Sequence, residues 1–193
     1  MHEQSLLELE QSLLWHEQPL LETPAPLGRD RMPSSRWKIR LLNLYPPYLG
    51  AGVRVRPSAD LRTFEVRMKI RFWNRNYVGT HFGGSLYTMC DPFLMLILME
   101  ALGRDYVVWD KAATIRFRRP GRGTVRARFH IPEERLAAIR AEADAAGRAE
   151  PRFTAEVRDR EGEVVAEVEK LLSVSRRGVA RPAPMPPTPP ALV

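Results

Sequence analysis

The segment of residues 86–102 is the feature that most limits how this chain can fold. Its apolar residues occupy every face of a helix rather than one stripe, namely Leu86, Met89, Phe93, Leu94, Met95, Leu96, Ile97, Leu98 and Met99. A helix that is apolar all round has to be buried all round. The chain must therefore curl a sheet around this helix, or enclose it between a sheet and a second subunit, and both arrangements are α+β.

Alternation of apolar and polar residues predicts about six strands, mostly in hairpins. They lie at residues 53–55, 64–70, 115–117, 125–131, 153–157 and 164–168. The turn RPGRG predicts a hairpin between residues 115–117 and 125–131, and the turn DREG predicts one between the last two strands. We therefore expect an antiparallel sheet curled around a long central apolar helix.

Two further helices are predicted beside the central one. Residues 35–45 read as a short helix that Pro46 and Pro47 would end. Pro132, followed by Glu133 and a second acid, is typical of a helix start, and Gly147 would end that helix.

The 193 residues fit one domain with two tails. Residues 1–34 combine a Leu-rich amphipathic stretch with a Pro-containing connector and are predicted to form an arm. Residues 35–176 would form the domain, and residues 177–193 are a Pro-rich tail.

Charge and composition narrow the function classes. The net charge is +7, but the 30 basic residues are interleaved with 23 acids, and no recognition motif accompanies them, so we expect no nucleic-acid partner. One cysteine and four scattered histidines favour neither a disulfide framework nor a metal. No secretory signal is evident and no apolar run reaches the roughly 18 residues of a membrane span, so we expect a cytoplasmic protein.

Gly83 and Gly84 precede the apolar helix and allow two interpretations. They could leave backbone N–H groups open to an incoming oxyanion, where the helix dipole favours negative charge. They could also be only a flexible turn into the helix.

Asp91 is the only acidic or basic residue between His81 and Glu100. Desolvation by its apolar neighbours would raise its pKa and make it a better base. The alternative is that Asp91 caps a helix that begins at Pro92. If the helix instead begins near Gly84, Pro92 lies inside it and kinks it.

Three residues near Gly83 and Asp91 also allow both a functional and a purely structural interpretation. His81 could act as an acid, a base or a carbonyl donor, or simply pack. Asn76 could orient water or the carboxylate, or form a turn. Cys90 is expected to be a small buried residue rather than a nucleophile.

The order Asn76, Gly79, Gly83, Gly84 and Asp91, leading into an apolar helix flanked by antiparallel strands, resembles the hotdog-fold acyl-CoA thioesterases. The nearest type is the phenylacetate-pathway thioesterases, whose motif is N-x-x-G-x-x-H-G-G followed after six residues by D. The stretches RLLNLYPPYLGAGV, GTHFGGSLYTMCDPF and VVWDKAATIRFRRPGRGTV also resemble a branch of that superfamily known as a domain of unknown function or tetrameric acyl-CoA thioesterase.

The resemblance implies roles for individual residues. The N–H of Gly83, with Gly84, would polarise the thioester carbonyl. Asp91 would be nucleophile or general base, supplied by a neighbouring subunit, and Asn76 would position water or substrate. One position departs from the motif: Phe82 stands where the motif has His, and His81 lies one position earlier.

The first functional hypothesis is therefore an acyl-CoA thioesterase with a site at a subunit interface. It would need no cofactor beyond the coenzyme A of its substrate, and it would be a homodimer or homotetramer acting on an acyl-CoA or acyl-carrier thioester. His81 and Phe82 would contact the substrate. The CoA phosphates would be bound by nearby cations, for which the candidates are Arg116, Arg118, Arg119 and Arg122. The alternative is that these arginines are ordinary solvated surface charges. The second hypothesis is a non-catalytic acyl-CoA or acyl-carrier binding protein of the same fold. A hydratase fits less well, because residues 91–102 supply no His to pair with the carboxylate.

Overall fold

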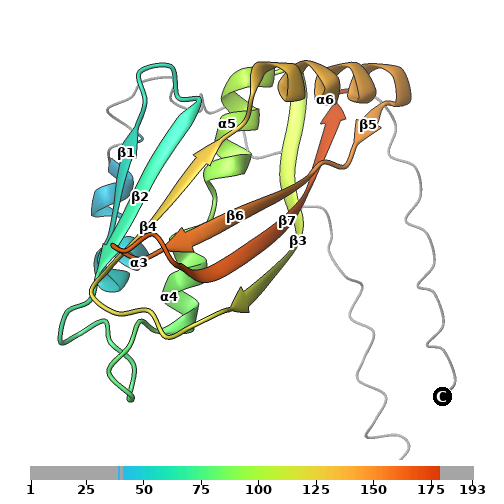
Figure 1. The fold of residues 1–193 in the computed structure, drawn as a ribbon. Coiled ribbons are helices and arrows are strands. Elements are labelled where there is room, and N and C mark those ends of the chain that lie inside the picture. Colours follow the sequence, from blue (N-terminus) through green and yellow to red (C-terminus); the bar gives the residue numbers. More distant parts are fainter. Residues whose placement is uncertain (1–38, 40, 179–193) are drawn as a thin grey trace, which may run out of the picture. The chain divides into compact units, whose positions relative to one another are not determined.

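The computed structural model describes residue 39 and residues 41–178, so the predicted arm and most of the predicted tail lie outside the described residues. The described strands form one antiparallel sheet (Figure 1). Its spatial order is β1 (Val53–Pro57), β2 (Thr63–Lys69), β4 (Thr124–His130), β6 (Arg152–Arg158), β7 (Val164–Arg176) and β3 (Tyr106–Phe117), with the short β5 (Arg148–Ala149) beside β7.

The apolar segment lies along one face of this sheet as α4 (Gly83–Thr88) and α5 (Phe93–Leu102), and α6 (Glu133–Ala146) crosses one end (Figure 1). A 3₁₀ turn, η1 (Leu41–Leu44), and α3 (Pro46–Ala51) precede β1. The expected α+β architecture, with a curved antiparallel sheet around a central apolar helix, is confirmed.

Aromatic side chains join the helix to the sheet. The ring of Phe93 lies 5.4 Å from that of Phe64 and 5.1 Å from that of Phe129, measured between centroids, and all three are buried. The stretch Gly83–Leu102 has the length and composition of a membrane span, but here it is the core helix of the fold.

The helical segment predicted before Pro46 and Pro47 does end there, at Leu44, but the prediction missed the helix that these prolines begin. These prolines are the first residues of α3, which continues to Ala51. Proline fits the first turn of a helix because the N–H group it lacks has no acceptor there. Of the helix predicted at residues 35–45, residue 39 and residues 41–45 are described, and η1 is a 3₁₀ turn.

The hairpin predicted across RPGRG is wrong. β3 pairs with β7, whereas β4 pairs with β2 and β6. The connection does not turn back on itself, because the N–H groups of Arg118 and Arg119 donate to the carbonyl of Val165, and that of Ile70 donates to the carbonyl of Gly123. These bonds carry the chain across the end of the sheet, from its edge strand to a central strand.

The other predicted strands and the helix after Pro132 are confirmed, although β3 is longer than the predicted residues 115–117. β6 and β7 form the hairpin across DREG. α6 ends at Ala146, where Gly147 has a positive φ of 73° that a side chain would disfavour.

Phe93→Ala should lower the free energy of unfolding by about 3–5 kcal/mol, because it opens a cavity between α5 and the sheet. Tyr77→Ala removes an aromatic ring that is fully exposed, and should change stability by less than about 0.5 kcal/mol. Urea unfolding of the two variants beside the unmodified protein measures both. Equal midpoints would contradict a core built on Phe93.

Candidate active site

The core helix is interrupted where Asp91 lies. α4 ends at Thr88, α5 begins at Phe93, and the Asp91–Pro92 peptide bond is cis. The residue capping α5 is Pro92, with no side-chain cap, so the interpretation of Asp91 as a helix cap is wrong. Helical structure begins at Gly83 and resumes after Pro92, as the motif resemblance implied.

A buried lysine holds Asp91. The Nζ atom of Lys170 lies 2.5 Å from Oδ1 of Asp91 and 2.7 Å from Oδ2 of Asp110. The lysine side chain is 1% exposed, whereas that of Asp91 is 43% exposed. Asp91 is therefore fixed from the protein side and open on the other, which suits a carboxylate that acts on a bound molecule.

The electrostatics of this cluster follow from burial and pairing. Burial alone would lower the pKa of Lys170, but its hydrogen bonds to Asp110 and Asp91 raise that pKa above the ordinary value. Burial raises the pKa of Asp110, and the neighbouring Asp91 adds to this, although Lys170 opposes it. The lysine therefore stays charged, and the pKa of Asp110 lies above its ordinary value.

Two tyrosines and the cysteine surround the break. The hydroxyl of Tyr48 donates to the backbone carbonyl of Asp91, and the Nζ atom of Lys170 lies 5.8 Å from the centre of the Tyr87 ring. Burial raises the pKa of the Cys90 thiol to about 12. The expectation that Cys90 is a buried residue and no nucleophile agrees with this environment.

A separate hollow of about 560 Å³ collects other predicted residues at the start of α4. Its lining includes Asn76, His81, Gly83, Arg118 and Arg119, together with Phe117 and Arg122. The hollow lies between the loop before α4 and the loop after β3. Residues up to 46 positions apart in sequence thus meet there, but Asp91 is not among them.

The glycine pair has a packing reason. A Cβ atom on Gly83 would lie 2.9 Å from the Phe117 ring, and one on Gly84 would lie 2.5 Å from the Phe82 ring. Neither glycine could carry a side chain without displacing an aromatic ring. Their N–H groups lie in the first turn of α4, where helical geometry leaves them without an intrahelical acceptor.

Asn76 and His81 are both held by backbone bonds. Asn76 closes its loop: its side-chain oxygen accepts from the N–H of Thr80, and its Nδ2 donates to the Thr80 hydroxyl at 2.9 Å. His81 is buried, with Nε2 3.2 Å from the carbonyl of Gly123 and with Nδ1 unpaired among the described residues. Burial lowers its pKa, so the imidazole is neutral near pH 7.

Phe82 and the four predicted arginines are exposed, and three of the arginines are engaged with acids. The Phe82 side chain, next to the hollow, is 58% exposed. Arg116 pairs with Glu169, Arg118 with Glu167 at 3.2 Å, and Arg119 with Asp159 at 3.0 Å. Of the residues lining the hollow, Arg122 is a cation without an ion pair among the described residues.

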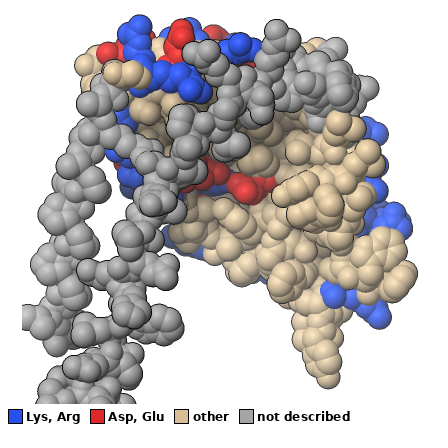
Figure 2. Space-filling view, turned by 180° about the vertical axis from the view of Figure 1, so that it is seen from behind, with Lys and Arg blue, Asp and Glu red and all other residues tan. Residues whose placement is uncertain are grey.

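One chain does not bring Asp91 and Gly83 together. They lie at opposite ends of the six-residue α4, separated by the helix itself. Figure 2 shows the side of the molecule behind the sheet of Figure 1, where uncharged residues cover most of the coloured surface and acidic side chains lie near its middle.

Comparisons with known proteins now define the family. The family model described as a domain of unknown function, DUF4442, matches residues 35–174. The chain belongs to this family. No protein of curated function matches the chain.

Solved structures resemble this DUF4442 chain in fold. A protein of unknown function and probable thioesterase from Pseudomonas aeruginosa, PA5026, is 26% identical with a TM-score of 0.65, over 75% of this chain and 98% of that one. OLEI01261, of unknown function, from Chlorobaculum tepidum is 19% identical with a TM-score of 0.58, over 72% of this chain and 93% of that one. Thioesterase HI1161 from Haemophilus influenzae is 14% identical with a TM-score of 0.54, over 74% and 91%. The predicted hotdog fold is confirmed.

Reasoning from the DUF4442 sequence missed Lys170 and Asp110. A signal was present for the lysine: it stands between Val168 and Leu172 at the inward positions of a strand, where a charge needs a partner. Among residues 39 and 41–178, no cluster of three or more His, Cys, Asp and Glu could hold a metal ion.

Lys170→Met should lower the free energy of unfolding at pH 7 by about 1–3 kcal/mol, because it leaves two neighbouring carboxylates without their cation. Partial exposure of both acids keeps the loss below that of a fully buried pair. Lys111→Met, which removes an exposed partner of Glu150, should cost at most about 1 kcal/mol.

The pH dependence has a definite sign. Because the pKa of Lys170 is raised by folding, its stabilisation is complete below the unfolded lysine pKa of about 10.4 and is lost as pH rises through the higher folded value. The deficit of Lys170→Met should shrink on acidification, because Asp110, whose pKa burial raises, takes up a proton and no longer needs the lysine charge. Urea unfolding at acidic and neutral pH measures this, and a deficit independent of pH would contradict it.

Proposed function

We propose that this chain is an acyl-CoA thioesterase whose site forms between two subunits. The observation that carries the proposal is a partly exposed carboxylate, Asp91, fixed by a buried lysine at a break in the core helix. The class of reaction is supported by PA5026, a probable thioesterase to which this chain is 26% identical over nearly all of the PA5026 chain.

The chemistry needs a base and an oxyanion donor. In this proposal, Asp91 accepts a proton from water while the water oxygen attacks the thioester carbonyl carbon. The carbonyl electrons move to oxygen, where the N–H of Gly83, with Gly84, donates to the negative charge. Collapse breaks the C–S bond, and the CoA thiolate takes the proton from Asp91. Direct attack by the Asp91 carboxylate, followed by hydrolysis of the anhydride, is the other route.

Lys170 and Asp110 would act through Asp91. The ammonium group fixes Oδ1, so the other carboxylate oxygen is the one presented to water. Asp110 shares the same lysine and has a raised pKa, so it provides a second place for a proton beside Asp91. Asn76 would act by holding the loop that leads to Gly83.

The subunit arrangement follows from the separation of the two parts. Asp91 and Gly83 lie at opposite ends of α4, so a productive pair requires Asp91 of one chain and Gly83 of another. β3 is the edge strand beside β7 and carries Asp110. Pairing of two β3 edges in a homodimer would bring the second subunit next to the Asp91 cluster. Within the site, Arg122 is the best placed cation for a CoA phosphate, with Phe82 and His81 nearby.

A binding protein of the same fold is the second candidate, and one contact favours it. The Phe82 ring, which stands where the resembled motif has His, packs against Gly84. The Phe82 side chain therefore offers no hydrogen-bond donor to a substrate carbonyl at the position of the motif His. Such a protein would bind acyl-CoA saturably without releasing thiol.

Asp91→Asn should lower thiol release from a panel of acyl-CoAs at least about 100-fold, because the amide cannot accept the proton of water. Asp144→Asn, an exposed acid that accepts from the Tyr106 hydroxyl, is the matched control and should keep full turnover. Unchanged turnover in Asp91→Asn would remove Asp91 from the mechanism. Acyl-CoA binding without thiol release by the unmodified protein would select the second candidate.

Mixing two inactive variants tests the shared site. Gly83→Val fills the space against Phe117 and should disable the oxyanion half, while Asp91→Asn disables the other half. After mixing and subunit exchange, activity should return to about a quarter of the unmodified level, because half of the pairs are mixed and each regains one of two sites. Activity that stays absent in verified mixed dimers would show that both halves belong to one chain.

A further inference from the structure

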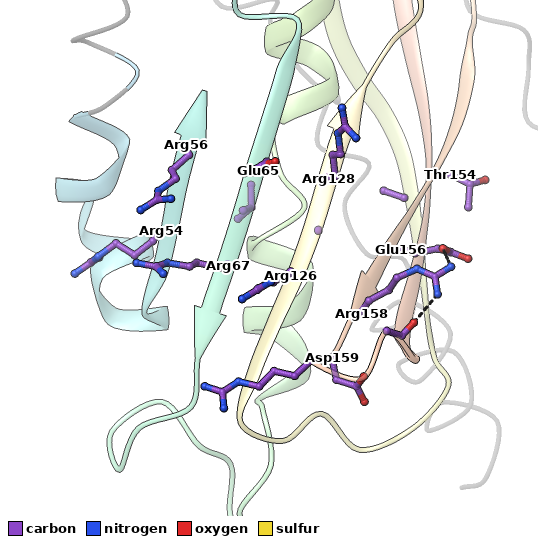
Figure 3. Close-up of a pocket in the computed structure, with 15 residues that line it drawn as sticks. Arg54, Arg56, Glu65, Arg67, Arg126, Arg128, Thr154, Glu156, Arg158 and Asp159 are labelled. Atoms are coloured by element: carbon purple, nitrogen blue, oxygen red, sulfur yellow. Dashed lines mark hydrogen bonds and ion pairs between the residues drawn. The ribbon is translucent and has the colours of Figure 1, made fainter. Parts of the chain in front are cut away.

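The outer face of the sheet carries a row of four arginines in register. Arg54 on β1 pairs with Arg67 on β2, Arg67 with Arg126 on β4, and Arg126 with Arg158 on β6. We call these four residues the arginine row (Figure 3). They alternate with the buried positions of their strands, so they lie on the side of the sheet away from the core helix.

The arginine row is unfavourable for the fold itself. Like charges directly opposite each other destabilise a sheet. Among the described residues, Arg54, Arg67 and Arg126 have no ion pair with an acid, while Arg158 pairs with Glu156. The neighbouring row shows the usual solution, because Glu65 lies between Arg56 and Arg128. An uncompensated row next to a compensated one indicates a surface that receives negative charge from beyond the described part of the chain.

The face is hollowed along this row. A cavity of about 920 Å³ is lined by the whole arginine row, by Arg56 and Arg128, and by the shorter side chain of Thr154 on the same face. A second cavity of about 550 Å³ shares Arg54, Arg67 and Arg126 and adds Lys69, Arg71 and Trp73. The two cavities therefore form one basic groove, and its acids, Glu65, Glu156 and Asp159, lie in the first cavity.

An aromatic surface lies at one end of the groove. Trp73 is 52% exposed, and the guanidinium of Arg71 lies 5.1 Å from the centre of its indole ring. A planar ring can stack on an exposed indole beside a guanidinium. The groove thus offers several cations in a line and a stacking surface at one end.

We propose that this groove binds a nucleoside polyphosphate, with its phosphates on the arginine row and its base against Trp73. Guanidinium groups match phosphate oxygens in paired hydrogen bonds, which explains a site built of arginine. Four strands span about 14 Å, which fits a short chain of phosphates joined to a nucleoside. The cavities have the size of small-molecule sites, which favours this ligand over a long nucleic acid. The groove lies across the sheet from Asp91, so the inference does not depend on the proposed hydrolase.

Calorimetric titration of the full-length protein with ATP at low salt tests the proposal. Saturable binding is expected, weakening as salt rises because the contacts are ionic. Inorganic tripolyphosphate should bind more weakly and adenosine should not bind detectably. Absence of ATP binding at about 1 mM would overturn the proposal. Tighter binding of a single-stranded oligonucleotide than of ATP would also overturn it and assign the groove to nucleic acid.

Two variants and a matched control locate the ligand. Arg67→Gln with Arg126→Gln should weaken ATP binding at least about tenfold. Trp73→Leu should weaken ATP while leaving tripolyphosphate unchanged. The control, Arg104→Gln with Arg135→Gln, removes the same charge from exposed sites outside the groove and should keep affinity within about twofold. Equal losses in the control would show non-specific attraction and overturn the site.

The stability of the groove variant provides an independent check on folding. Removing Arg67 and Arg126 relieves like-charge repulsion, so the double variant should unfold at the same temperature as the unmodified protein or higher. A lower unfolding temperature would mean that these arginines stabilise the sheet, which contradicts the premise of the proposal.

Discussion

The ion pairs of Lys170 connect the three parts of the molecule on which the site depends. Its ammonium group comes from the inward face of β7, and its two partners come from the break in the core helix and from the edge strand β3. An ammonium group in the core requires such partners, since an unpaired buried charge is strongly destabilising. The same contact that satisfies the lysine sets the position of Asp91, so the fold and the geometry of the site have a common cause.

The glycine pair and Asp91 are the two halves of the proposed site, and each has a structural reason of its own. Gly83 and Gly84 make room for the rings of Phe117 and Phe82, and Asp91 satisfies Lys170. Packing and chemistry are therefore not exclusive explanations. A close-packed ring keeps the first turn of α4 in place without using its N–H groups, and Lys170 engages one carboxylate oxygen and leaves the acid partly exposed.

Periodicity predicted the parts of this fold that depend on burial. The all-round apolar pattern gave the core helix, alternation gave β2, β4, β6 and β7, and Gly147 gave the end of α6. The sequence could not show which strands pair, because an alternating strand has the same pattern beside any neighbour. For this reason β3 was predicted beside β4 instead of β7. Pro46 and Pro47 were misread because proline is compatible with both ends of a helical segment. The inward strand position of Lys170 was a local signal that a partner is needed, but the identity of that partner was not accessible, because a contact between residues 60 positions apart leaves no local pattern.

Two populations of arginine divide the surface of the sheet. On the β3 side, Arg116, Arg118 and Arg119 are matched by acids from β7 and the turn before it, so that part of the sheet is close to neutral. On β1, β2 and β4 the arginine row has no such acids among the described residues. Back-to-back packing of two sheets through the row would bring unpaired cations together and remove them from water. Contact through the largely uncharged helix side has no such penalty. The two proposals, subunit assembly and anion binding, therefore use different faces of the domain.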